Sequence, residues 1–143
     1  MRSLVLAAVV TLALAGAAAA ASAPSVEKPG QNSTVRLEHL VTGHLTELNG
    51  KYKLRATETV YEPGGRIGAH HHVGPGIRYV LAGELTSIQP DRTTIYRAGD
   101  YFYESGDTKH TAENRTSSRV VILNFELLPA GWAGGSAVPP MRH

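Results

Sequence analysis

Short segments in which apolar and polar residues alternate, separated by clusters of Gly, Pro, Asn and Asp, run through the chain from Val35 onward. Alternation with a period of two is typical of strands with one buried face, and such clusters form the turns between antiparallel strands. The predicted strands are residues 35–40, 52–61, 66–70, 77–81, 85–89, 93–96, 100–104, 109–113 and 119–127. This pattern predicts an all-β, single-domain jelly roll or closed β-barrel, which leaves few strand edges exposed.

The first 21 residues have the pattern of a secretory signal peptide. Met1 and Arg2 give a positive start, residues 3–16 are apolar, and an alanine-rich run follows. A membrane anchor is the alternative, but the apolar run leads into small residues and not into a basic flank. The sequence therefore predicts an exported protein, periplasmic or extracellular, without a stable membrane anchor.

Three segments are expected after the signal peptide at 1–21. Residues 22–34 are rich in Pro, Gly and polar residues and are predicted to be a linker. Residues 35–128 are predicted to form the β-barrel. Residues 129–143 are rich in Gly and Pro and are predicted to be a loose tail, which Trp132 could pin to the barrel.

Composition excludes several classes of function. The chain has no Cys, which rules out disulfides, thiolate metal ligands and a cysteine nucleophile. Its 14 Lys and Arg nearly balance 12 Asp and Glu and form no basic stripe, so nucleic acid is not a predicted partner. The predicted partner is a small-molecule ligand or substrate.

Histidines provide the clearest chemical signal. In an extended strand, the side chains of His70 and His72 point to one face and that of His71 points to the other. His110 lies in a later predicted strand, and three imidazoles from neighbouring strands suffice for a facial metal site. An isolated run of three histidines can also be a polar surface turn. The surrounding sequence is therefore needed to distinguish a metal site from such a turn.

The residues around these histidines resemble the two motifs of the cupin family. The matching positions are Gly64, His70–His72, a Gly-Pro-Gly turn and residues 79–83 for the first motif, and Gly99, His110 and Asn114 for the second. The resemblance covers roughly residues 52–125. It implies a jelly-roll barrel in which His70, His72 and His110 bind one metal ion, and it suggests a homodimer.

One position departs from the cupin pattern. The Glu that the family places after the second histidine falls on Gly76, which cannot bind a metal. The predicted site is therefore reduced to three histidines. Glu104 and Glu84 are alternative sources of a carboxylate, although each lies at a turn offset from Gly76.

Three neutral imidazoles leave the charge of a divalent ion uncompensated and several coordination positions open. Among cupins such sites occur in iron-dependent dioxygenases. The resemblance therefore implies a three-His dioxygenase acting on a small molecule, anionic or neutral, with Fe(II) favoured and Mn, Ni, Cu or Zn as alternatives. Two further hypotheses are a non-catalytic small-molecule-binding module and a cupin-type isomerase. The fold alone does not distinguish these three functions.

Strand parity extends the prediction to nearby residues. If Gly76 faces inward, Arg78 shares that face and could bind a substrate carboxylate; an Arg at the barrel rim is the alternative. Tyr101 and Tyr103 precede the histidine of the second motif and are candidate substrate-binding residues, although aromatic side chains here are most often part of the core or of a pocket wall. No catalytic residue can be named from the sequence.

Overall fold

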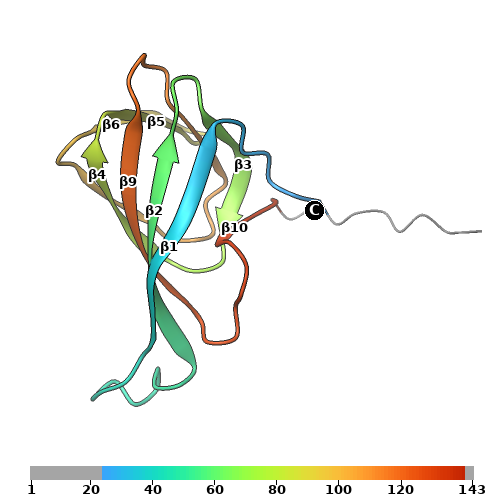
Figure 1. The fold of residues 1–143 in the computed structure, drawn as a ribbon. Coiled ribbons are helices and arrows are strands. Elements are labelled where there is room, and N and C mark those ends of the chain that lie inside the picture. The colour runs from blue at the N-terminus through green and yellow to red at the C-terminus, as the bar shows by residue number, and fades with distance from the viewer. Residues whose placement is uncertain (1–23, 141–143) are drawn as a thin grey trace, which may run out of the picture.

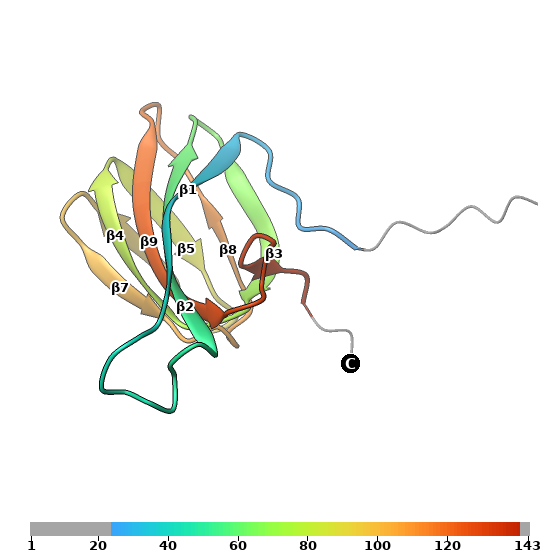
Figure 2. The ribbon, with the colours of Figure 1, turned by 60° about the horizontal axis from the view of Figure 1, so that its bottom comes forward.

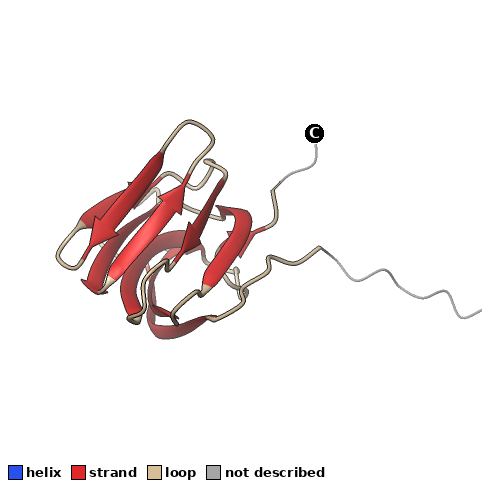
Figure 3. Cartoon of the chain, turned by 90° about the horizontal axis from the view of Figure 1, so that it is seen from above, coloured by secondary structure: helices blue, strands red, loops and turns tan. Residues whose placement is uncertain are grey.

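Strands account for all the regular structure in the computed structural model, which describes residues 24–140 (Figures 1 and 3). In chain order they are β1 (Gln31–Leu40), β2 (Tyr52–Tyr61), β3 (Arg66–His72), β4 (Gly76–Ala82), β5 (Glu84–Ile88), β6 (Thr93–Arg97), β7 (Tyr101–Glu104), β8 (His110–Glu113), β9 (Val120–Pro129) and β10 (Ala137–Val138). The predicted all-β class is confirmed. No helix in the described part of the chain has the length and apolarity to span a membrane.

The strands form two five-stranded sheets. The first has the order β1-β2-β9-β4-β7 and the second the order β10-β3-β8-β5-β6. Every pairing within the sheets is antiparallel. Apart from the hairpins β1–β2 and β5–β6, successive strands lie in different sheets, so the two sheets enclose a common interior (Figure 2). This is the jelly-roll arrangement that the alternation predicts.

The barrel interior differs in character along its strands. An apolar cluster occupies one part and consists of Tyr61, Ile67, Leu85, Ala112, Val120 and Ile122. Further along the same strands the buried side chains are polar or charged, among them Arg55, His70, Arg78, His110 and Glu126. Because buried polar groups are costly unless they are paired, this second part of the interior must hold an organised set of partners.

The segment that precedes the predicted barrel is partly built into it. β1 begins at Gln31, inside the predicted linker at 22–34, because Gln31 pairs in register with Tyr61 of β2. Upstream of β1, the carbonyl of Glu27 accepts a hydrogen bond of 2.8 Å from the backbone N–H of Gly68 in β3. The predicted signal peptide at 1–21 lies outside the described residues.

The C-terminal segment 130–138, which lies in the predicted tail at 129–143, docks on the barrel. Ala137 and Val138 form β10 and pair with His72 and His71 of β3. The guanidinium of Arg55 donates hydrogen bonds to the carbonyls of Gly134 at 2.6 Å and Trp132 at 3.2 Å. The segment is therefore held mainly by its backbone carbonyls, which no side-chain pattern reveals.

Replacing the guanidinium should release this segment. In Arg55→Gln, we expect amide hydrogen exchange in residues 130–138 to become roughly tenfold faster or more, because two charge-assisted hydrogen bonds are lost. Hydrogen exchange read by mass spectrometry measures this. Arg36→Gln is the control, since Arg36 pairs with Glu58 on the exposed side of the same sheet. Equal exchange in both variants would show that β10 pairing alone holds the segment.

Asn114, the last position of the second motif, is a structural residue. It is 1% exposed, and its Nδ2 donates to the carbonyls of Tyr61, Glu62 and Ser118. Its Oδ1 accepts from the backbone N–H of Thr116 at 3.0 Å. The side chain thus ties the turn after β2 to the turn between β8 and β9.

Asn114→Ala should destabilise the fold by roughly 2–4 kcal/mol, because several buried backbone carbonyls lose their donor. Urea unfolding followed by circular dichroism gives this value. Ser117→Ala changes an exposed residue of the same turn and should alter the free energy of unfolding by less than about 0.5 kcal/mol.

Candidate metal centre

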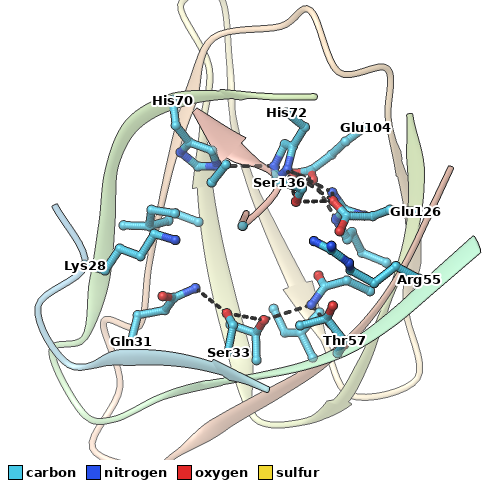
Figure 4. Close-up of a pocket in the computed structure, with 18 of the residues that line it drawn as sticks. Lys28, Gln31, Ser33, Arg55, Thr57, His70, His72, Glu104, Glu126 and Ser136 are labelled. Carbon is cyan, nitrogen blue, oxygen red and sulfur yellow. Dashed lines mark hydrogen bonds and ion pairs between the residues drawn. The ribbon is translucent and has the colours of Figure 1, made fainter. Parts of the chain in front are cut away.

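The three predicted histidines lie together inside the barrel. Figure 4 shows two of them, His70 and His72, at the wall of the cavity. His70 and His72 come from β3 and His110 comes from β8, where it pairs in register with His70. The Nε2 atoms of His70 and His72 are 3.2 Å apart, and ligand atoms of all three rings lie within 4.8 Å of one another. The shared face that strand parity predicts is therefore present.

Backbone carbonyls fix the orientation of two of these rings. Nδ1 of His70 donates to the carbonyl of Gly68 at 2.8 Å, and Nδ1 of His110 donates to that of Thr108 at 3.0 Å. A neutral imidazole with its proton on Nδ1 presents the lone pair of Nε2, and this is the form in which His70 and His110 would bind an ion. Burial, with the neighbouring His110 and His72, lowers the pKa of His70 to about 3. That ring is therefore neutral, as a metal ligand must be.

His71 does not belong to this group, as predicted. It is half-buried and pairs with Val138 of β10. Strand alternation accounts for this difference between adjacent histidines.

Two carboxylates stand beside the histidines. Glu104 of β7 places Oε2 3.1 Å from Nε2 of His72 and Oε1 2.9 Å from Nε2 of His110. Glu126 of β9 places Oε1 3.4 Å from the other nitrogen of His72, Nδ1. Of the two carboxylates considered from the sequence, Glu104 reaches the site, whereas Glu84 pairs with Arg97 at the surface.

Sequence reasoning missed Glu126. Its parity on β9 marks it as inward-facing, but the residue is 54 positions from His72, and only the register of β9 against β4 brings it to the site. No motif in the sequence signals that register.

Arg78 faces inward, as predicted, and is 3% exposed. Its Nε donates to Oε2 of Glu104 at 2.7 Å, and its Nη2 donates to Oε1 of Glu126 at 3.0 Å. Burial would raise the pKa of Glu104, but hydrogen bonds from His110 and His72 and the charge of Arg78 hold it well below its usual range. The charge of Arg78 is thus matched by protein carboxylates, and its role toward a substrate stays a prediction.

The structure has no room for a side chain at position 76, which is why this residue is Gly. A Cβ atom there would lie 2.2 Å from Nη1 of Arg78 and 2.7 Å from the carbonyl oxygen of Phe125. Gly76 does not have a positive φ angle, so its backbone conformation alone would accept other residues. The guanidinium of Arg78 therefore occupies the space in which a side chain at position 76 would lie.

A cavity of about 260 Å³ opens beside the histidines. Its polar wall is formed by Ser33, Thr57, Thr59 and Asn124, and its apolar end by Tyr61, Ile67, Leu85, Phe102, Ala112 and Ile122. Arg78, Glu104 and Glu126 line it next to the histidines, and its other lining residues are Lys28, Gln31, Val35, Arg55 and residues 133–137. Ser136 of this last group donates to Oε1 of Glu126 at 2.5 Å and lies 3.2 Å from Nδ1 of His72.

Tyr101 and Tyr103 point away from this cavity. They are 71% and 65% exposed, and Tyr101 packs against Tyr79 on the outer face of the sheet. Alternation along β7 turns Phe102 and Glu104 inward in their place. Tyr103 lines a second pocket of about 130 Å³ that also reaches His72, Glu104 and His110. Substrate binding by the two tyrosines stays a prediction, without a contact in the main cavity.

The donor set fits a divalent transition metal ion. Imidazole nitrogen suits Fe, Cu, Ni and Zn, and a nearby carboxylate extends the set to Mn. The ring nitrogen of His72 that does not face His70, Nδ1, has partners in Ser136, Arg78 and Glu126, which is the support that metal-binding histidines usually have. His70, His72 and His110 could therefore hold one ion.

Comparison with known proteins agrees with this architecture. The family model for the cupin domain matches residues 57–126, which include all three histidines. A search of curated proteins gives no match. A cupin domain from Bordetella pertussis has a TM-score of 0.53 at 20% identity, covering 71% of this chain and 96% of that one.

Two other solved structures are similar to the same degree. KdgF from Halomonas sp. has a TM-score of 0.53 at 20% identity, with coverage of 68% of this chain and 81% of that one. A protein with a double-stranded β-helix domain from Klebsiella pneumoniae has a TM-score of 0.53 at 20% identity, covering 76% and 84%. These structures support the fold, and the family model supports the motif positions. The chain therefore carries a cupin domain and belongs through it to the cupin family.

Proposed function

We propose that this protein binds one divalent metal ion, Fe(II) in preference to Mn, Ni, Cu or Zn, and acts as a dioxygenase on a small molecule. The observation that carries the proposal is the convergence of His70, His72 and His110, two of them oriented by backbone carbonyls that accept hydrogen bonds from Nδ1. Bound Fe(II) would supply the one-electron chemistry that lets O2 react with an organic substrate.

The cavity supports a small ligand next to this site. Its volume is just below the usual range for sites of drug-sized molecules, and it combines an apolar end with a few polar groups. Lys28 contributes a positive charge to the lining, which favours an anionic ligand. The side chains of Ser33, Thr59 and Asn124 are hydrogen-bonded to one another, so this wall is pre-organised.

We also propose export to the periplasm or the extracellular space, on the strength of the residues at 1–21. In such a compartment the protein would take up its ion after leaving the cytoplasm. Metal analysis therefore has to use protein purified from the compartment in which it accumulates.

Oxygen consumption tests the reaction class. Elemental analysis of the native protein should find one metal ion per chain. With Fe(II) and candidate small acids and ketones as substrates, an oxygen electrode should record substrate-dependent O2 uptake. Turnover without O2 would support the isomerase alternative, and thermal stabilisation by a ligand without product would support a binding module.

Replacing one ligand should abolish metal binding. For the parent protein, an ion at 100 times its Kd should add about 2.7 kcal/mol to the free energy of unfolding, visible as a higher melting temperature. His72→Ala should lose this gain and its bound metal. His71→Ala is the matched control, since its ring points away from the group, and it should keep both. If the two variants retain equal metal, the ligand assignment is wrong.

A further inference from the structure

The two inward carboxylates occupy matching places on either side of Gly76. Glu104 of β7 is its direct partner across one edge of β4, and Glu126 of β9 is its direct partner across the other. All three positions face the interior. The carboxylate that the cupin pattern places at position 76 is therefore absent from β4, but each neighbouring strand offers one at the same level of the sheet.

We propose that Glu104 is a fourth ligand of the metal ion held by His70, His72 and His110. The proposal rests on the metal binding proposed above. Glu104 lies on β7 and is not one of the positions that match the cupin motifs. The position where the cupin pattern has its Glu ligand is Gly76 in this chain, which cannot bind a metal.

Distances between the donor atoms support this assignment. Two adjacent ligands of an octahedral ion, each about 2.1 Å from the metal, lie roughly 3.0 Å apart. The distance between Nε2 of His70 and Nε2 of His72 is 3.2 Å. Glu104 Oε2 lies 3.1 Å from the same nitrogen of His72, and its Oε1 lies 2.9 Å from Nε2 of His110. One oxygen of the carboxylate thus lies at the spacing of an adjacent ligand from His72, and the other oxygen lies at that spacing from His110. Glu104 is not part of the group of ligand atoms within 4.8 Å that joins the three histidines, so its carboxylate would have to shift toward His70 when the ion binds.

Glu126 is related to the histidines in a different way. It approaches Nδ1 of His72, the nitrogen on the opposite side of the ring from the site, and shares that position with Ser136. It can therefore orient His72 without reaching the ion. This difference makes Glu126 the natural control for Glu104, because both carry one negative charge, are inward-facing and contact Arg78.

The arrangement changes the charge of the site. Glu104 and Glu126 contribute two negative charges and Arg78 one positive charge, so these three side chains sum to one negative charge. A divalent ion among neutral histidines then leaves one net positive charge, where a site of histidines alone would leave two. A ligand with a single negative charge would neutralise these groups, and Lys28 adds one further positive charge to the cavity lining, so the expected substrate class is anionic.

The test compares Glu104→Gln with Glu126→Gln, using Co(II) as the probe ion. Chelator competition gives the affinity, and the visible absorption spectrum of bound Co(II) reports its ligands. If Glu104 is a ligand, its variant should bind Co(II) at least tenfold more weakly than the Glu126 variant and show a changed spectrum. The Glu126 variant should retain the parent spectrum.

Equal Co(II) affinities of the two variants, with spectra like that of the parent, would overturn the proposal. Loss of either negative charge would then have the same effect on binding, and Glu104 would not be a ligand. Circular dichroism shows whether each variant folds. Should Glu104→Gln fail to fold, Glu104→Asp keeps the charge near Arg78 but withdraws the carboxylate by one methylene, and it should also lose affinity and change the spectrum.

If the parent itself binds no Co(II) and holds no metal when purified, the proposed function fails. If the parent binds Co(II) and the Glu104 variants match it, only the present inference fails.

Discussion

A buried ionic network organises the site, with Arg78 between Glu104 and Glu126. Burying three charges is costly unless each is paired, and removal of one partner leaves the others uncompensated in a medium of low dielectric constant. The network also joins three adjacent strands, β7, β4 and β9. Through Glu126 it reaches His72 and Ser136, so the histidine ring and the C-terminal segment depend on the same set of charges.

Most strands, the three histidines and the inward position of Arg78 could be predicted, because the sequence patterns that indicate them are local. Period-two alternation gave all the long strands, with β2 at its observed bounds, and parity alone separated His70 and His72 from His71 and turned Arg78 inward. The resemblance added His110. These predictions need only the geometry of one strand at a time, which a single sequence contains.

What could not be predicted depends on register between distant strands. Glu126 reaches His72 only because β9 pairs with β4, and the tail docks only because Arg55 meets backbone carbonyls some 80 residues further on. Backbone acceptors are present at every residue, so composition gives no sign of which ones are used. The exposed positions of Tyr101 and Tyr103 follow from a local rule, but only once the bounds of β7 are known.

The close approach between Gly76 and Arg78 has a consequence for how this site can change over evolution. A side chain at position 76 and the guanidinium cannot occupy the same space, and the carbonyl of Phe125 limits it further. A single substitution toward the usual cupin pattern would therefore create a clash before it created a ligand. The two positions are therefore coupled: a side chain at position 76 displaces the guanidinium of Arg78 and shifts the backbone near Phe125, and Glu104 would then lose the cation that pairs with it.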